Sequence, residues 1–313
     1  MNRRLRWAIV GSGQIAKKFA ADFHFVNNAE LVAVTSQNFA NAQRFARDFN
    51  LQAFADLDEM LATKPDVVYV ATPHSMHLEH TLRALNAGAA VLCEKPFALN
   101  SHEAEKMIAS NKSFLMEAMW TRFLPATQKI LDVIPRLGQI RRLEANFGYA
   151  FPFDAKSRVY NSELGGGSLL DVGVYCVAFF QWILQQPPTS ISASLQLSAT
   201  GVDESAHFSL RYGNRQAEGM SSVVEQTNHQ AIIEGSDGFI RIPQFWCPRG
   251  FFLNDEYVKA EFTGQGFHFE AQEVTDCILR GETESRTWPL SKTLEAARIL
   301  DQIAMKGSHP IGN

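Results

Sequence analysis

A glycine-rich turn follows the first apolar segment of the chain and begins a helix-like pattern. The run Leu5 to Val10 leads into Gly11-Ser12-Gly13-Gln14-Ile15-Ala16, and apolar residues then recur at helical spacing at Ile15, Phe19 and Phe23. In such a turn the first glycine permits a tight bend and the second lets the backbone approach a pyrophosphate, while a small third residue lets the helix pack on the strand. The amides at the helix start favour phosphate groups. The turn therefore predicts a dinucleotide-binding βαβ unit.

The first 120 residues alternate between strand-like and helix-like patterns. Continuous apolar runs occur at 5–10, 31–35, 66–71 and 89–93, and helical patterns lie between them. Continuous apolar strands separated by helices indicate a parallel sheet that is covered on both faces. We therefore expect an α/β domain with a doubly wound parallel sheet of the Rossmann type.

The pattern changes after about residue 120. Strand-like segments such as 140–149, 190–199, 206–212 and 216–224 follow one another without long helices between them, and many alternate apolar and polar residues. This alternation is typical of a sheet with one solvated face. We therefore predict two domains. Residues 1–118 form the dinucleotide-binding domain, and residues 119–313 form an α+β domain with a large, open, mostly antiparallel sheet.

Composition excludes several classes of protein. The 313 residues carry a net charge of -4, which gives no basic footprint for nucleic acid. The four cysteines are scattered without a CxxC pair, which argues against a disulfide scaffold and a cysteine zinc site. His74, His77 and His80 lack a supporting carboxylate pattern, so we expect no metal.

The apolar segments of the chain bear on its location. The uninterrupted apolar run near the N-terminus, 7–10, is too short for the apolar region of a signal peptide. No apolar stretch approaches the roughly 18 residues that span a bilayer. We therefore expect a cytoplasmic protein with no membrane partner.

The end of the second predicted strand bears on the choice of dinucleotide. NAD-binding units usually carry an Asp or Glu about 20 residues after the turn, where it holds the ribose 2′-hydroxyl. This chain has Ser36-Gln37-Asn38 there, and these side chains can donate hydrogen bonds to a 2′-phosphate. No arginine adjoins them, although Arg44 lies about two helical turns on. We expect NADP, with NAD as the alternative.

Three further motifs follow the glycine turn in order. They are ATPHSMH at 71–77, AGAAVLCEKP at 87–96 and GGGSLLDVGVY at 165–175. In order and spacing, over the whole chain, they resemble the motifs of the Gfo/Idh/MocA oxidoreductase family. The resemblance implies a Rossmann domain followed by a domain whose open sheet often mediates oligomers, here a homodimer or homotetramer. It also implies NAD(P)-dependent chemistry between the alcohols and carbonyls of sugars or related polyols.

Details of the motifs resemble one branch of that family. His74, the segment 117–123 (EAMWTRF) and Tyr175 are similar to the branch of dihydrodiol dehydrogenase, xylose dehydrogenase and glucose-fructose oxidoreductase. The Ser36-Gln37 pair departs from the usual Ser-Arg or Ala-Arg of that branch. The implied substrate is a sugar, a cyclic polyol or a trans-dihydrodiol.

The resemblance also implies site residues. By position, the catalytic candidates are Lys95, Asp171 and Tyr175, and the substrate candidates are Trp120, Arg122 and Tyr175. The cofactor candidates are Gly11, Gly13, Gln14, Ile15, Ser36, Gln37, Thr72, Pro73, His74, His77, Glu94 and Lys95.

The chemistry is consistent with these residues. Oxidation of a secondary alcohol needs a base for the hydroxyl proton and an acceptor for the hydride. A cationic Lys95 nearby would lower the pKa of the Tyr175 phenol and make it that base. Alternatively, Lys95 exchanges the proton and Tyr175 orients the hydroxyl. Asp171 lies four residues before Tyr175, so both share one face of a helix that starts near Leu169.

Two other functions are compatible with the sequence. One is a redox-neutral glycosidase or lyase of the same fold that uses NAD transiently. The other is a non-catalytic NAD(P)-binding sensor, which the combination of Lys95, Asp171 and Tyr175 argues against, since a sensor needs no proton-transfer group.

Overall fold

The computed structural model of the protein describes residues 4–307. The chain forms two compact units. The first unit contains residues 4–120 and 263–294, and the second contains residues 121–262 and 295–307. The chain passes from the first unit to the second after residue 120, near the boundary predicted at residue 118. Residues 263–294 return to the first unit, although the sequence placed them in the second domain.

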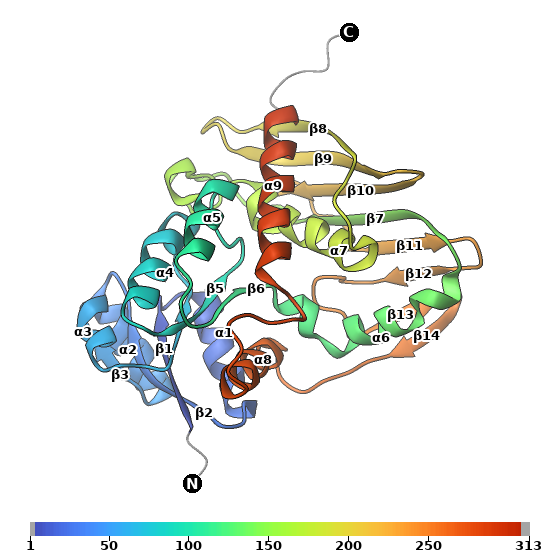
Figure 1. The fold of residues 1–313 in the computed structure, drawn as a ribbon. Coiled ribbons are helices and arrows are strands. Elements are labelled where there is room, and N and C mark those ends of the chain that lie inside the picture. The colour runs from blue at the N-terminus through green and yellow to red at the C-terminus, as the bar shows by residue number, and fades with distance from the viewer. Residues whose placement is uncertain (1–3, 308–313) are drawn as a thin grey trace. The chain divides into compact units, whose positions relative to one another are not determined.

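The first unit is built on a six-stranded sheet with the order β3-β2-β1-β4-β5-β6 (Figure 1). Every neighbouring pair is parallel. The strands are β1 (Leu5–Val10), β2 (Ala29–Thr35), β3 (Gln52–Phe54), β4 (Val67–Val70), β5 (Ala90–Glu94) and β6 (Leu115–Ala118). Residues of β4 and β5 are buried throughout, as their continuous apolar sequences predict. This strand order is that of a Rossmann fold, which confirms the predicted fold class.

The helices of the first unit begin at residues that suit a helix start. Side chains of Asn38, Asp56 and Asn100 accept hydrogen bonds from backbone amides in the first turns of three of them. The helices are α1 (Gln14–Asp22), α2 (Phe39–Phe49), α3 (Leu57–Ala62), α4 (His77–Asn86), α5 (Ser101–Ala109) and α8 (Phe267–Leu279), with 3₁₀ turns η1 (Phe23–Phe25) and η2 (His74–Met76).

The returning segment is fixed to the first unit by a buried carboxylate. Asp22, at the end of α1, accepts hydrogen bonds from the backbone N–H groups of Gln265, Gly266 and Phe267 at 2.7–3.1 Å. Asp22 thereby satisfies donors at the start of α8 that have no partner within their own helix. This long-range cap explains why 263–294 belongs to the first unit.

The second unit is built on an eight-stranded sheet with the order β14-β13-β12-β11-β7-β10-β9-β8 (Figure 1). Only β7 and β10 pair in parallel among its described strands. The strands are β7 (Ile140–Gly148), β8 (Ser190–Leu197), β9 (Asp203–Tyr212), β10 (Arg215–Ser222), β11 (Ala231–Gly235), β12 (Phe239–Ile242), β13 (Gly250–Leu253) and β14 (Glu256–Lys259). Exposed and buried residues alternate at the start of β8, which confirms the predicted mostly antiparallel sheet with a solvated face.

One buried helix, α7 (Val174–Leu184), packs on this sheet. The Cys176 thiol on α7 contacts the carbonyl oxygens of Ala145 on β7 and Met220 on β10. The remaining helical elements of the unit are α6 (Pro125–Val133), η4 (Ile134–Leu137), η5 (Ser162–Leu164) and a π-helical turn, η6 (Leu169–Gly173). The short turn η3 (Trp120–Phe123) and the helix α9 (Leu290–Gly307) each continue from one unit into the other.

The segment Ser162–Leu184 differs from one expectation. By length and composition alone it is apolar enough to cross a membrane, with a mean hydropathy of 1.5. However, 89% of its most apolar window is buried inside the protein, as is usual for a core helix.

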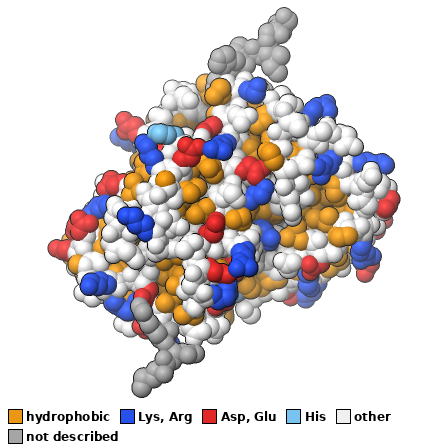
Figure 2. Space-filling view, viewed as in Figure 1, with side chains coloured by type: hydrophobic (Ala, Val, Ile, Leu, Met, Phe, Trp, Pro, Cys, Tyr) orange, Lys and Arg blue, Asp and Glu red, His pale blue; other side chains and the backbone are white. Residues whose placement is uncertain are grey.

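On the face drawn in Figure 2, basic and acidic side chains are interspersed, and the described residues form no large area of one charge there.

Candidate active site

The glycine turn of the first unit fits a bound pyrophosphate. Gly11 adopts a positive φ of 111°, and a Cβ atom there would lie 2.3 Å from the Ala71 carbonyl oxygen. Gly13 is different, because a Cβ atom there would meet nothing within 4 Å. No side chain caps the start of α1. Open space beside Gly13 and uncapped amides after it are what a phosphate group needs at a helix N-terminus.

The end of β2 lies beside this turn. The Ser12 hydroxyl donates a hydrogen bond to the Ser36 hydroxyl at 2.9 Å. Gln37 is exposed, whereas the Asn38 side-chain oxygen is engaged in capping α2, at 3.0 Å from the Ala40 amide. Ser36 and Gln37 are therefore better placed than Asn38 to receive a ribose or its phosphate.

The three histidines predicted after β4 hold neighbouring loops. His77 is completely buried, and its Nδ1 lies 2.9 Å from the Pro96 carbonyl oxygen while its Nε2 lies 3.0 Å from that of Thr72. Burial is the main cause that lowers the pKa of His77 to about 4, against the effect of these backbone contacts. His80 contacts the Thr72 hydroxyl at 3.1 Å, and the His74 ring packs edge-on against that of His77. Within residues 4–307 no group of histidine, cysteine and acidic side chains is arranged to hold a metal ion.

Lys95 lies at the carboxyl end of β5, where open parallel sheets bind ligands. It is half-buried. The preceding Glu94 is buried, and its carboxylate accepts hydrogen bonds from the Tyr69 hydroxyl and, at 3.2 Å, from the Lys95 backbone N–H. Burial raises the pKa of Glu94 to about 7, against the effects of the Tyr69 hydroxyl and the Lys95 charge. The Glu94 carboxylate is thus engaged inside the unit.

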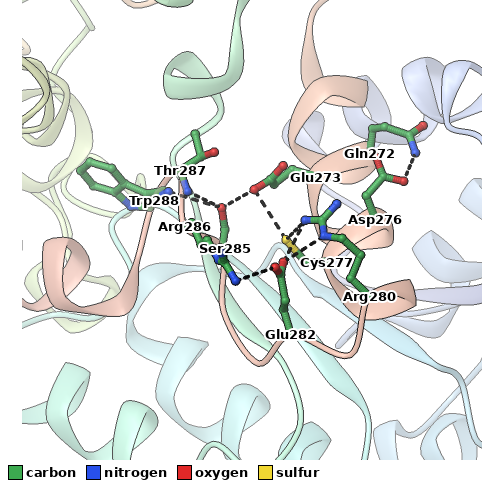
Figure 3. A network of polar contacts seen from close by, with 10 residues as sticks. All are labelled: Gln272, Glu273, Asp276, Cys277, Arg280, Glu282, Ser285, Arg286, Thr287 and Trp288. Carbon is green, nitrogen blue, oxygen red and sulfur yellow. Dashed lines mark hydrogen bonds and ion pairs between the residues drawn. The ribbon is translucent and has the colours of Figure 1, made fainter.

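Glu117, on β6, anchors the loop that carries Lys95. Its carboxylate accepts the backbone N–H of Phe97 at 3.2 Å and the indole N–H of Trp288 at 3.0 Å. Trp288 belongs to the returning segment and adjoins the polar network in Figure 3. There the Ser285 hydroxyl donates to Glu273 at 2.5 Å and accepts the Trp288 backbone N–H at 3.3 Å. This network was not predicted from the sequence.

An aromatic pair lies just after the carboxyl end of β6. The rings of Trp120 and Phe267 stack with centroids 4.5 Å apart, and both side chains are buried. Phe267 lies 147 positions after Trp120 and carried no sequence signal of its own. Arg122 is half-buried and belongs to the second unit.

In the second unit, Asp171 and Tyr175 come from one helical segment. Asp171 lies in the π-helical turn η6 and Tyr175 in the first turn of α7, and both are buried. Asp171 accepts hydrogen bonds from Arg158, at 3.1 Å, and from the Tyr149 hydroxyl. The Tyr175 ring packs against Phe147, with centroids 5.5 Å apart. A π-helical turn is common at functional sites.

Arg158 and Tyr149 were not among the predicted site residues. Tyr149 follows β7, and Arg158 lies in an irregular stretch between β7 and η5. Burial is the largest cause that raises the pKa of Tyr149, and the Asp171 charge adds to it. Lys95 and the Asp171–Tyr175 pair thus lie in different units.

Comparison with known proteins defines the class. Residues 5–113 match the model of an oxidoreductase family with an NAD-binding Rossmann fold, and residues 135–241 match the GFO/IDH/MocA C-terminal domain. The chain belongs to the Gfo/Idh/MocA oxidoreductase family. It is an NAD(P)-dependent oxidoreductase that acts on CH–OH groups.

Full-length relatives are similar in sequence. The trans-1,2-dihydrobenzene-1,2-diol dehydrogenase of Danio rerio is 35% identical over 320 residues, covering 95% of each chain. The enzyme of that name from Homo sapiens is 32% identical over 321 residues, covering 96% of each chain.

Solved structures share the fold at lower identity. An aldose-aldose oxidoreductase from Caulobacter crescentus, 23% identical, covers 98% of each chain with a TM-score of 0.89. A 3-ketoreductase from Actinomadura kijaniata in complex with NADP, also 23% identical, covers 97% of this chain and 98% of its own with a TM-score of 0.88.

Proposed function

We propose that this protein is an NADP-dependent dehydrogenase of cyclic trans-diols, with trans-dihydrodiols as the leading class and sugars or cyclic polyols as the alternative. The observation that carries the proposal is the full-length similarity to enzymes named trans-1,2-dihydrobenzene-1,2-diol dehydrogenase, at 32–35% identity. The stacked pair of Trp120 and Phe267 supports it, because aromatic side chains suit an apolar ring.

In this proposal the chain's own groups handle the hydroxyl proton, while a bound nicotinamide supplies the hydride acceptor. Lys95 and Tyr175 are the proton-transfer candidates, one exchanging the proton and the other orienting the hydroxyl. Asp171 is a positioning group, because Arg158 and Tyr149 already donate to its carboxylate. It holds the start of α7, and with it Tyr175, in a fixed orientation.

The proposal of NADP over NAD rests on the end of β2. Ser36 and Gln37 present hydrogen-bond donors there, and no acidic side chain is present to hold a free 2′-hydroxyl or repel a 2′-phosphate. The other proposed cofactor-binding groups are Gly11, Gly13, Gln14, Ile15, Thr72, Pro73, His74 and Lys95. The polar atoms of His77 and Glu94 contact other groups of the first unit. We therefore assign these two residues to support the loops that bind the cofactor.

A cofactor-reduction screen tests the proposal. The purified protein is incubated with NAD or NADP and with trans-dihydrodiols, aldopentoses, hexoses or inositols, and absorbance is followed at ~340 nm, where the reduced nicotinamide absorbs. We expect reduction with a trans-dihydrodiol and NADP. A preference for NAD above about tenfold contradicts the cofactor assignment. Substrate conversion without net cofactor reduction points to a redox-neutral enzyme, and tight NADPH binding without any turnover points to a sensor.

We also propose a homo-oligomer that forms through the solvated face of the eight-stranded sheet. This face carries a hollow of about 440 Å³, lined by side chains that include Glu144, Ser192, His207 and Met220. Light scattering coupled to gel filtration measures the mass in solution, and a monomer contradicts this assignment.

We further propose a cytoplasmic location, which the four free cysteines support. Imaging of a fluorescent fusion tests it.

A further inference from the structure

The stacked aromatic pair and the candidate catalytic lysine leave the same edge of the six-stranded sheet. β5 and β6 run parallel, with Glu94 opposite Ala118. Lys95 directly follows Glu94, and Trp120 is the second residue after Ala118. Open parallel sheets bind ligands at this carboxyl edge. The ring of Trp120, with the ring of Phe267 stacked on it at 4.5 Å, therefore lies at the edge where a ligand is expected.

Phe267 is held by a residue of α1. It is the first residue of α8, and the position before it is occupied by Gly266, which has no side chain to cap the helix. The cap comes instead from Asp22, the last residue of α1, which is 3% exposed. Its Oδ2 atom accepts the backbone N–H groups of Gln265, Gly266 and Phe267 at 2.8, 2.7 and 3.1 Å. Hydrogen bonds to a carboxylate are stronger than those between neutral groups, so Asp22 is a firm anchor for this backbone.

The turn before α8 is shaped around the same carboxylate. Gly264 and Gly266 adopt positive φ angles of 72° and 105°. A Cβ atom at Gly264 would lie 2.7 Å from Oδ1 of Asp22 and 2.9 Å from a ring carbon of Phe25. Glycine reaches positive φ without strain, so the two glycines let the backbone close around Asp22. This fit sets the place where Phe267 begins its helix.

We propose that Asp22 is a positioning residue for substrate binding. Through the backbone N–H of Phe267 it holds the Phe267 ring against Trp120, and it thereby sets the affinity of the site for a diol on a flat, unsaturated ring. Aromatic rings attract one another only in particular arrangements, so this affinity depends on where the pair is held. The inference rests on the proposed function, in which the pair contacts the substrate, and it adds the residue that fixes the pair.

Asp22→Ala removes the anchor, and steady-state kinetics with a trans-dihydrodiol measure the consequence. We expect KM to rise about tenfold and kcat to stay within about twofold of the wild type, because binding is lost and the reacting groups are unchanged. NADPH affinity stays the same, since Asp22 lies about 13 Å along α1 from the glycine turn. A merely structural role lowers the folded fraction, and with it the apparent kcat, but leaves KM unchanged. Asp22→Asn keeps an acceptor oxygen, so we expect it to restore most of the wild-type KM.

A double-mutant cycle tests whether Asp22 acts through Phe267. Phe267→Leu removes the ring, and we expect it to raise KM about as much as Asp22→Ala does. Asp22→Ala should then add nothing in the Phe267→Leu background. Asp56→Ala is the matched control, because Asp56 caps α3 in the same unit by accepting the N–H of Asp58 at 2.7 Å. We expect its KM to equal that of the wild type.

Fluorine NMR of the full-length protein labelled with 5-fluorotryptophan measures the aromatic pair without any turnover. Trp120→Phe identifies the resonance of Trp120. We expect Asp22→Ala to shift this resonance, because the Phe267 ring stacked on it moves, and Asp56→Ala to leave it in place. If Asp22→Ala fails to fold, Gly264→Ala disturbs the same turn without changing the carboxylate, and the same rise in KM and the same shift are expected.

The contradicting results are specific. An unchanged KM or an unmoved Trp120 resonance in Asp22→Ala overturns the inference, as does an additive effect in the double variant or an equal rise of KM in Asp56→Ala. When Gly264→Ala replaces Asp22→Ala, wild-type values in Gly264→Ala do the same.

The two readouts also separate this inference from the proposed function. If the wild type turns over no trans-dihydrodiol, the proposed function is overturned, and the fluorine spectrum decides by itself whether Asp22 holds the pair. If the wild type turns over a trans-dihydrodiol and Asp22→Ala does so with the same KM, the inference alone is overturned.

Discussion

The indole N–H of Trp288 donates a hydrogen bond to the buried carboxylate of Glu117 at 3.0 Å, across 171 positions of sequence. The other oxygen of that carboxylate accepts the N–H of Phe97, two residues after Lys95. The segment that returns to the first unit is therefore linked through one carboxylate to the loop of the candidate catalytic lysine.

Trp288→Phe tests this link. The change removes one donor from a buried carboxylate and leaves the ring packing largely in place. We expect a loss of about 1–3 kcal/mol in the free energy of unfolding, measured by urea titration. Trp246→Phe is the control, because its indole N–H makes a longer contact of 3.4 Å, with His229. Equal stability of Trp288→Phe and the wild type contradicts the importance of this hydrogen bond.

Two glycines of the phosphate-binding turn give a matched pair of substitutions. In Gly11→Ala the new methyl group would meet the Ala71 carbonyl at 2.3 Å in a backbone conformation with positive φ, so we expect about 1–3 kcal/mol of destabilisation. In Gly13→Ala the methyl group meets nothing within 4 Å, so stability stays near that of the wild type.

The same pair differs in cofactor binding. The methyl group of Gly13→Ala occupies space proposed for the pyrophosphate, so we expect NADPH affinity to fall by roughly 10- to 100-fold. Calorimetric titration and thermal unfolding measure the two effects. If Gly13→Ala binds NADPH as tightly as the wild type does, the proposed pyrophosphate position beside Gly13 is wrong.

His77 predicts a pH-dependent difference in stability. Its pKa is lowered to about 4 in the folded protein, whereas an unfolded chain protonates histidine near its ordinary value of about 6.5. The unfolded state therefore binds more protons between these values, and the contribution of His77 to stability is lost as the pH falls through them.

The comparison of wild type with His77→Gln isolates that contribution. The stability advantage of the wild type over the variant should shrink by on the order of 3 kcal/mol between pH 7 and pH 4. Urea titrations at both pH values measure it. A stability advantage of the wild type that stays constant, or that grows as the pH falls, contradicts this role of His77.

Tyr149→Phe tests the positioning role of Asp171. The change removes one of the two donors to that carboxylate and leaves Arg158 in place. We expect kcat to fall by about tenfold, because one charge-assisted hydrogen bond is lost, with no change in NADPH affinity. Steady-state kinetics and cofactor titration distinguish these quantities. A loss of cofactor affinity with unchanged kcat argues against this role.

Local patterns were enough to predict the class of fold. Continuous apolar strands such as Val67–Val70 can be buried only in a sheet covered on both faces, and Gly11 marks the turn by a positive φ that few residues adopt. The alternation in β8 likewise indicated a sheet with a solvated face.

Long-range partners could not be predicted in this way. The sequence places the residues of α8 in the predicted second domain, 119–313, because nothing in their periodicity shows that Asp22 caps the helix. Arg158 lies in a stretch without regular structure, and its role depends on Asp171, which it meets only after folding.

The central claim is that Lys95 exchanges the proton of the reaction, and Lys95→Met tests it most directly. The variant is first shown to bind NADPH as the wild type does, and its turnover is then measured with the substrate found in the screen. The account predicts that kcat falls by roughly 10²- to 10⁴-fold, as for the loss of a general acid–base group. Wild-type turnover in a variant with normal cofactor binding would contradict it.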